Sequence, residues 1–292
     1  MISLILCLSA CYKSNLPYDA SGVFEAKEII VSSEMTGKLI RFNVEEGQSC
    51  SQNQIVGQVD DLQLVLRKKQ LLANIQAIKS RQPNISKQIA VLKQQLISVK
   101  KEKIRVEKLV KNQALPDKQL DDIIAQVEIL EKQEDALKSS LTNNNKGLQD
   151  DIIALKFQLD QLNDMINKCK IINPIQGTVL SKYTTQHEIV LPGKALYKIG
   201  DLQNMMLRAY ITSEQLSKLK LGQSVYVYAD FGRAATKKYQ GEIIWISSKS
   251  EFTPKTIQTK DERANLVYAI KIAIPNDGFL KLGMYGNVRL FL

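Results

Sequence analysis

Few residues in this sequence could carry out chemistry. Its single histidine, His187, is followed by Glu188, as in the His-Glu-x-x-His zinc motif, but Leu191 stands where the second histidine would be. We expect His187 to be a surface residue beside a turn. A cysteine nucleophile needs a neighbouring base, and Cys50 and Cys169 have no candidate besides His187. The sequence therefore predicts a protein that works by shape and contact, with no catalytic residues, no metal and no cofactor.

The most prominent predicted element is a helical hairpin over residues 62–168. Its apolar residues are spaced alternately three and four apart, which is typical of a coiled coil. Lys103, Glu134 and Asn145 are polar residues at positions of this repeat. Two arms of about 45 to 50 residues would reach about 70 Å. The apolar positions are Ile85, Ile89, Leu92, Leu96, Val99, Val106 and Val110 in the first arm, and Ile123, Val127, Leu130, Leu137, Leu141, Leu148, Ile152, Leu155, Leu159, Leu162 and Ile166 in the second.

Strand-rich segments flank the hairpin on both sides. Residues 23–61 are expected to hold an N-terminal strand of the barrel and a first half-domain, and residues 169–201 a second half-domain. Each half shows short strands bounded by glycines and is too small to bury a core alone. We expect them to pack together as one sandwich into which the hairpin is inserted. Residues 202–292 contain further short strands, typical of a small β-barrel. Within them, Ser213–Leu219 is expected to be a short helix with Ser213 as its N-cap, and 247–265 an exposed loop.

The first eleven residues predict a secretory signal. A short apolar run ends in Leu8-Ser9-Ala10-Cys11, which resembles a bacterial lipobox with Cys11 as the lipidated residue. The run is too short to span a membrane, so the lipid would tie the chain to a membrane surface. Cys7 would leave with the signal. A Cys50–Cys169 disulfide is conceivable, although nothing in the sequence requires it.

The formal net charge of +10 permits two interpretations. A basic chain can bind nucleic acid or an anionic surface. However, acidic and basic residues alternate along the arms, as in Lys100-Lys101-Glu102-Lys103, which is typical of a solvated coiled-coil surface. A nucleic-acid-binding arm stays as an alternative, although the arms lack interleaved aromatic residues for base stacking.

The order of these elements resembles the HlyD-type periplasmic adaptors, also called membrane fusion proteins. The resemblance implies a mixed α+β fold: an antiparallel coiled-coil hairpin inserted into a split lipoyl-like sandwich, followed by a small β-barrel. Segment 250–256 resembles the branch related to YbhG. The residues that match the lipoyl-like halves are Gly37, Val44, Gly47, Gly57 and Asp60 in the first, and Pro174, Gly177, Val179, Pro192, Gly193 and Asp201 in the second.

The hairpin bend carries a more local resemblance. Adaptors that dock onto a TolC-like outer-membrane channel often have an arginine, a leucine four residues later and a serine seven residues after that. This sequence has Arg105, Leu109 and Pro116 at these positions, followed by Asp121. The resemblance implies a channel-docking tip, with proline in place of the serine. Pro116 is expected to be the first helical residue of the second arm. Alternatively, Leu109 and its neighbours simply close the end of the coiled coil.

The resemblance also implies partners and location. We expect a subunit of a tripartite efflux or secretion system, lipid-anchored in the periplasm, most simply to the inner membrane. It would form a hexamer, contact an inner-membrane exporter and reach a TolC-like channel, without binding nucleic acid. The chain ends soon after the barrel, which favours an ABC-type exporter. A lipoyl or biotinyl carrier is the other alternative, although the hairpin interrupts the position where such a domain presents its modified lysine.

Overall fold

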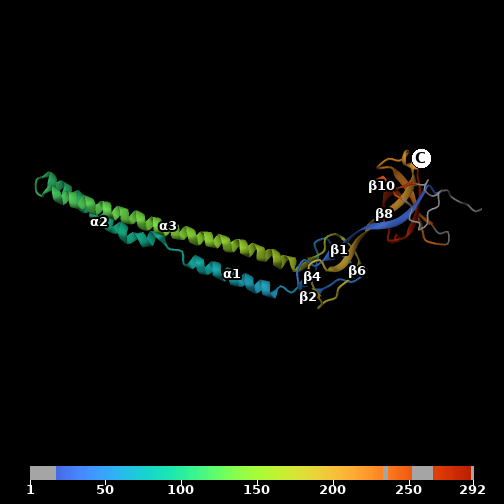
Figure 1. Ribbon diagram of the computed structural model, residues 1–292, viewed down its shortest axis with the longest axis horizontal. Coiled ribbons are helices and arrows are strands. Elements are labelled where there is room, and N and C mark those ends of the chain that lie inside the picture. The colour runs from blue at the N-terminus through green and yellow to red at the C-terminus, as the bar shows by residue number, and fades with distance from the viewer. Residues whose placement is uncertain (1–17, 233–235, 252–265, 291–292) are drawn as a thin grey trace, which may run out of the picture. The chain divides into compact units, whose positions relative to one another are not determined.

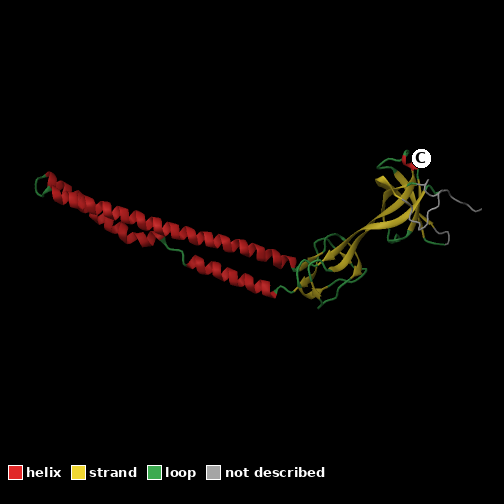
Figure 2. Cartoon of the chain, viewed as in Figure 1, coloured by secondary structure: helices red, strands yellow, loops and turns green. Residues whose placement is uncertain are grey.

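The computed structural model describes residues 18–232, 236–251 and 266–290. These residues form two compact units, one from Asp60 to Cys169 and one built from the strands on either side of it (Figures 1 and 2). The predicted signal with Cys11, and residues 252–265 of the predicted loop, lie outside the described residues.

The first unit is an antiparallel helical hairpin made of three helices, two in the first arm and one in the second. They are α1 (Leu62–Ser80), α2 (Ile85–Lys111) and α3 (Asp117–Lys168). Both α1 and α2 pack against α3. Every position of the predicted apolar repeat is buried or half-buried, so the coiled-coil seam is confirmed. Lys100 of α2 and Glu131 of α3 form an ion pair of 2.6 Å across the hairpin and therefore lie opposite each other.

The first arm is two helices rather than the single arm that was predicted. Residues 81–84 interrupt it. Pro83 has no N–H, and its ring disfavours the helical conformation in the preceding residue. The Asn84 side chain then caps the new helix by accepting a hydrogen bond from the Lys87 N–H at 3.1 Å. The apolar spacing alone does not reveal this break, because it continues on both sides.

The second unit begins with two strand-rich halves. A four-stranded sheet has the order β5-β4-β2-β7, and β3 pairs with β6, which pairs in turn with β8. The two halves exchange strands, because β2 of the first pairs with β7 of the second and β3 pairs with β6. The strands are β1 (Ala20–Ser32), β2 (Gly37–Phe42), β3 (Ser49–Cys50), β4 (Ile55–Val59), β5 (Lys170–Ile172), β6 (Gly177–Lys182), β7 (Ile189–Val190) and β8 (Ala195–Thr212).

The two halves repeat each other with one constant offset in residue number. β2 and β6 begin and end at residue numbers that differ by the same amount. The same difference separates β3 from β7 at both ends, and the start of β4 from the start of β8. The hydrogen bonds that join the halves are reciprocal. Gly47 N–H donates to Val179 O at 2.9 Å, and His187 N–H donates to Leu39 O at 2.8 Å. The halves therefore form one structure related by an approximate two-fold axis.

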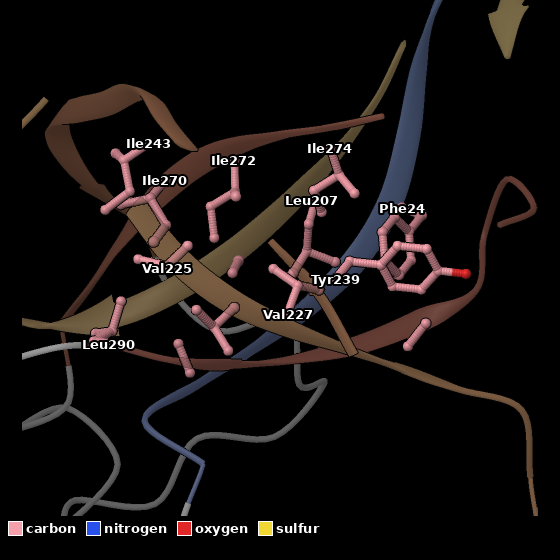
Figure 3. Packing of buried hydrophobic residues seen from close by; sticks show 14 of the residues in the cluster. Phe24, Leu207, Val225, Val227, Tyr239, Ile243, Ile270, Ile272, Ile274 and Leu290 are labelled. Atoms are coloured by element: carbon pink, nitrogen blue, oxygen red, sulfur yellow. The ribbon is translucent and has the colours of Figure 1, made fainter. Parts of the chain in front are cut away.

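Six strands of the larger sheet close into a ring. Its order is β1-β12-β9-β10-β11-β8, and β8 pairs back with β1. Inward-facing residues such as Phe24, Leu207, Val227, Ile243 and Ile272 are less than 2% exposed and form one apolar core (Figure 3). The remaining ring strands are β9 (Ser224–Asp230), β10 (Thr236–Glu251), β11 (Val267–Pro275) and β12 (Tyr285–Arg289).

Three details of the ring differ from the sequence predictions. First, one long strand, β8, continues past residue 201 where separate short strands were expected, and its pairing with β1 shifts register between Glu25 and Lys27. Second, residues 247–251 of the predicted loop continue β10. Third, the short helix α4 (Ser213–Leu216) is capped by Thr212 instead of Ser213, because Thr212 and Gln215 form a reciprocal capping box.

Candidate docking site at the hairpin bend

The bend is built from the way α2 ends. Asn112 is its C-cap, and Gln113 follows in the left-handed conformation with φ of 58°. Gln113 N–H donates to Val110 O at 2.8 Å, and Ala114 N–H donates to Leu109 O at 2.9 Å. These two bonds are those of a Schellman motif, which satisfies the last carbonyls of a helix. The chain is thereby turned sharply within a few residues.

Pro116 then sets the start of α3. Its φ of −68° and ψ of 147° make it the N-cap, one residue before the predicted position, and the helix begins at Asp117. The extended ψ explains the difference, since Pro116 itself is not helical. Its carbonyl accepts the Gln119 N–H at 3.1 Å. Proline supplies no capping side chain, but Asp117 in the first turn is favourable near the positive helix end.

The four predicted docking residues all lie within about two turns of the bend, and all are exposed. Arg105 and Leu109 are one turn apart and share a face of α2. Arg105 forms an ion pair of 2.5 Å with Glu102 on the same helix, and Leu109 is 38% exposed. Asp121 lies on the second turn of α3. The bend therefore presents an apolar side chain flanked by charges of both signs.

Gln113, on which the bend depends, was not among the predicted residues. The nearby signals are Asn112 and Pro116, since asparagine and proline are common where a helix ends, but neither indicates Gln113 itself. The bend itself offers contact rather than chemistry. Among the residues that the structure describes, no cluster of three or more His, Cys, Asp or Glu side chains could hold a metal. Cys50 and Cys169 are free thiols, and burial raises the pKa of both.

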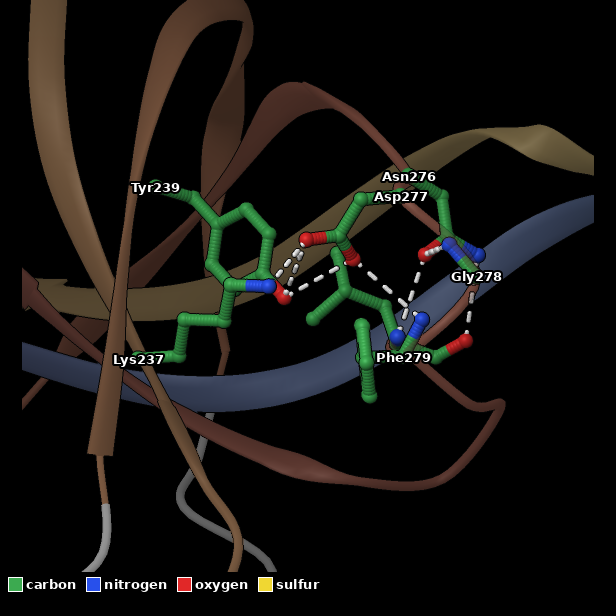
Figure 4. Close-up of polar contacts among 7 residues, drawn as sticks. Lys237, Tyr239, Asn276, Asp277, Gly278 and Phe279 are labelled. Atoms are coloured by element: carbon green, nitrogen blue, oxygen red, sulfur yellow. Dashed lines mark hydrogen bonds and ion pairs between the residues drawn. The ribbon is translucent and has the colours of Figure 1, made fainter.

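A polar cluster beside the loop between β11 and β12 is structural. Lys237 forms an ion pair with Asp277, and the Tyr239 hydroxyl donates to Asp277 at 3.0 Å (Figure 4). The Lys237 ammonium also lies 4.3 Å from the centre of the Phe279 ring. The hydrogen bond from Lys237 holds the pKa of Asp277 below the usual value. Because the three polar groups satisfy one another, the cluster holds the loop in place.

Comparison with known proteins identifies the fold. The structure superimposes on MacA from Actinobacillus actinomycetemcomitans with a TM-score of 0.57 at 18% identity, covering 92% of this chain and 76% of MacA. It also superimposes on the membrane fusion protein Spr0693 from Streptococcus pneumoniae R6 with a TM-score of 0.52 at 18% identity, covering 92% of this chain and 96% of Spr0693. The chain has the fold of a membrane fusion protein. No family model matches the sequence.

The sequence is also similar to a curated protein over part of its length. It is 32% identical over 120 residues to the UPF0194 membrane protein YbhG of Salmonella gallinarum. The match covers 41% of this chain and 36% of YbhG, so the chain matches only about a third of that relative. The resemblance to the HlyD-type periplasmic adaptors, and to their YbhG-related branch, is confirmed. Within the described residues, no helix of this membrane fusion protein fold combines the length and apolarity needed to cross a bilayer.

Proposed function

We propose that this chain is a periplasmic adaptor subunit of a tripartite efflux or secretion system. The observation that carries the proposal is the combination of the membrane fusion protein fold with a long, exposed hairpin that ends in a capped bend. In this role the chain links an inner-membrane exporter, ABC-type in the first instance, to a TolC-like outer-membrane channel. Its action is non-covalent, and the exporter supplies the energy.

The parts of the molecule receive roles under this proposal. The strand-exchanged halves over 23–61 and 169–201 act as a split lipoyl-like domain, and the six-stranded ring as the adaptor barrel. Copies of these parts assemble into a hexameric ring around the exporter. Cys11 carries the lipid that anchors the chain in the inner membrane. The hairpin bend, with Arg105, Leu109, Pro116 and Asp121, docks onto the channel.

The geometry of the halves argues against a carrier function. A lipoyl or biotinyl carrier presents its modified lysine on a tight turn between neighbouring strands. Here the neighbouring strands β4 and β5 are separated by the whole unit from Asp60 to Cys169. The chain leaving β4 continues into Asp60, Asp61 and α1, without a lysine on a hairpin turn.

Site-specific photo-cross-linking tests the docking role. A photoreactive amino acid at Leu109 is expected to capture an outer-membrane channel in intact cells, identified by mass spectrometry. The matched control is Gln88, which is exposed on the same helix and about 30 Å from Leu109 along its axis. Equal capture from both positions, or capture of cytosolic proteins or nucleic acid from Leu109, would remove the docking role. Cell fractionation of the same strains reports whether the chain is membrane-bound.

A further inference from the structure

The break in the first arm is a true helix end followed by a true helix start. Beyond Ser80, Arg81 N–H donates to Ile78 O at 3.0 Å and Gln82 N–H to Lys79 O at 3.2 Å. These are three-residue bonds, which tighten and finish a helix. The ladder of four-residue bonds resumes only after Asn84, whose side chain caps α2. No backbone hydrogen-bond ladder therefore stiffens the first arm over residues 81–84.

The second arm contains a segment of low helix propensity, although α3 is continuous. Residues 142–147 read Thr-Asn-Asn-Asn-Lys-Gly, and Thr, Asn and Gly are among the poorer helix formers. The Thr142 hydroxyl donates to Lys138 O at 2.8 Å, a contact that loosens and bends helices. A side chain at Gly147 would meet no atom within 4 Å, so packing does not require glycine there.

The two weak segments adjoin each other at one level of the hairpin. Lys100 and Glu131 lie opposite each other, as their ion pair shows. Asn84 is sixteen residues before Lys100, and Gly147 is sixteen residues after Glu131. Because antiparallel helices rise equally per residue, Asn84 and Gly147 are level with each other. Figure 1 shows the same arrangement, with the gap between α1 and α2 beside the uninterrupted α3.

Two shielded polar groups without hydrogen-bond partners among the described residues also lie near this level. Asn145 occupies a seam position, and its Oδ1 is shielded from solvent without a hydrogen-bond partner among the described residues. Gln82 Nε2, at the break, is shielded and unpartnered as well. Shielded polar groups without partners favour any conformation that returns them to water. Backbone continuity, helix propensity and the pairing of polar groups are thus all reduced near one level.

We propose that residues 81–84 and 142–147 form a joint at which the hairpin bends. The joint divides the rod into a base, made of α1 and the second half of α3, and an outer part, made of α2 and the first half of α3. Bending at the joint requires opening of the α3 hydrogen bonds over one or two turns only. The joint would change the direction of the bend while the base stays fixed. This use rests on the proposed docking function, whereas the existence of the joint does not.

Hydrogen exchange measures the opening. Amides of 142–148 are expected to exchange at least tenfold faster than those of α3 turns on either side. Replacement of the exposed Asn143, Asn144 and Gly147 by alanine raises helix propensity without touching the seam, and is expected to slow this exchange at least tenfold. The control variant has alanine at Gln126, Gln133 and Ser140, which are also exposed on α3. It should leave the exchange of 142–148 unchanged. Uniform exchange along α3 in the unaltered chain would overturn the proposal.

Distances between spin labels measure the bending. Labels at the exposed Lys132 and Asp160 span the joint, and labels at the exposed Lys118 and Lys138 lie within the outer part. The spanning pair is expected to give a broader distance distribution, which narrows in the triple-alanine variant. Equal widths for both pairs would overturn the proposal. Failure of the Leu109 cross-link together with a broad spanning distribution would reject the docking function and leave the joint standing.

Discussion

Gly47 and His187 occupy equivalent turns of the two halves, and both have positive φ, 82° and 76° respectively. The second pair of turn positions behaves the same way, with Asn53 at 64° and Gly193 at 85°. Each half thus uses one glycine and one other residue where the backbone is left-handed. Since a side chain in this conformation is strained by roughly 1–2 kcal/mol, the symmetry identifies which residue is the strained one in each turn.

Replacement of His187 by glycine is therefore expected to stabilise the fold by up to about 1 kcal/mol, after the added entropy of the unfolded glycine. His187→Ala, which removes the side chain but keeps the strain, should not stabilise. Gly47→Ala should destabilise by about 1 kcal/mol, because it introduces the strain in the other half. Thermal unfolding of the three variants measures these shifts. Equal stabilisation by glycine and alanine at 187 would contradict the backbone explanation.

Glu188 predicts a dependence of stability on pH. Its hydrogen bonds with Lys194 and then Thr185 lower its pKa from 4.5 to about 2. A carboxyl with a lowered folded-state pKa stabilises the fold above its unfolded pKa, and this contribution is lost as pH falls from about 4.5 towards 2. The equivalent residue, Gln48, makes the same backbone contact, to Glu45 N–H at 3.0 Å.

Glu188→Gln should therefore keep the turn and remove the pH dependence. Denaturant titrations at several pH values are expected to show a difference between the unaltered chain and this variant that is constant above pH 5 and shrinks below it. Lys194→Met is the complementary control, since it leaves Glu188 without its main partner. A difference that does not change with pH would show that the carboxylate charge has no part in stability.

Leu109 allows docking to be separated from folding. Its side chain is 38% exposed, so Leu109→Asp should change the free energy of unfolding by less than about 0.5 kcal/mol. Export by cells that depend on this chain is expected to fall sharply, because the apolar contact at the bend is lost. Val91→Asp is the matched control, since Val91 is 68% exposed on the same helix and away from the bend. Similar export losses in both variants would point to a general effect on α2.

Asn173 carries the main buried polar network. Its Nδ2 donates to Ser51 O at 2.8 Å and Ile175 O at 2.6 Å, and its Oδ1 accepts the Tyr197 hydroxyl at 3.0 Å. Asn173→Ala leaves these groups unpaired and should cost about 3 kcal/mol. The equivalent residue is Ser33, which bonds Met35 O in the same way. Asn173→Ser should therefore restore part of the loss.

The double variant Asn173→Ala with Tyr197→Phe checks the network. Tyr197→Phe alone is expected to cost about 1 to 2 kcal/mol, because it leaves Asn173 Oδ1 without a donor. When the two residues are changed together, the loss should be smaller than the sum, since neither partner is then left behind. Additive losses, measured by urea unfolding, would mean that the hydroxyl bond contributes little.

The sequence predicts the periodic parts of this molecule well and the aperiodic parts less well. Apolar spacing identified the seam, from Ile85 to Ile166, because burial in a coiled coil repeats along the chain. Apolar spacing missed the break at Pro83, because the spacing of apolar residues continues from Ile85 in the same phase. The continuity of β8 was missed because its middle is irregular. Asp201 accepts the N–H groups of Gln203 and Asn204, as a turn residue does, although β1 pairs with β8 on both sides of this point.

The residues of the bend were likewise predicted only in part. Arg105, Leu109, Pro116 and Asp121 were found by resemblance, and their roles stay predictions. Gln113 was not found, because a left-handed residue that is neither glycine nor asparagine has no strong sequence signal. Local hydrogen bonds around the bend, instead of side-chain type, decide its conformation.

The constant offset between the two halves limits where this chain can change in length. One residue added within β2 or β3 would shift that strand against its partner in the other half and turn its side chains to the wrong face. The same holds for the equivalent segment of the other half, so each half fixes the length of its counterpart. The helical insertion is free of this constraint, because whole heptads can be added to both arms together. Among relatives with intact strand pairing, we therefore expect differences in length to accumulate in multiples of seven along the rod, while the halves keep their size.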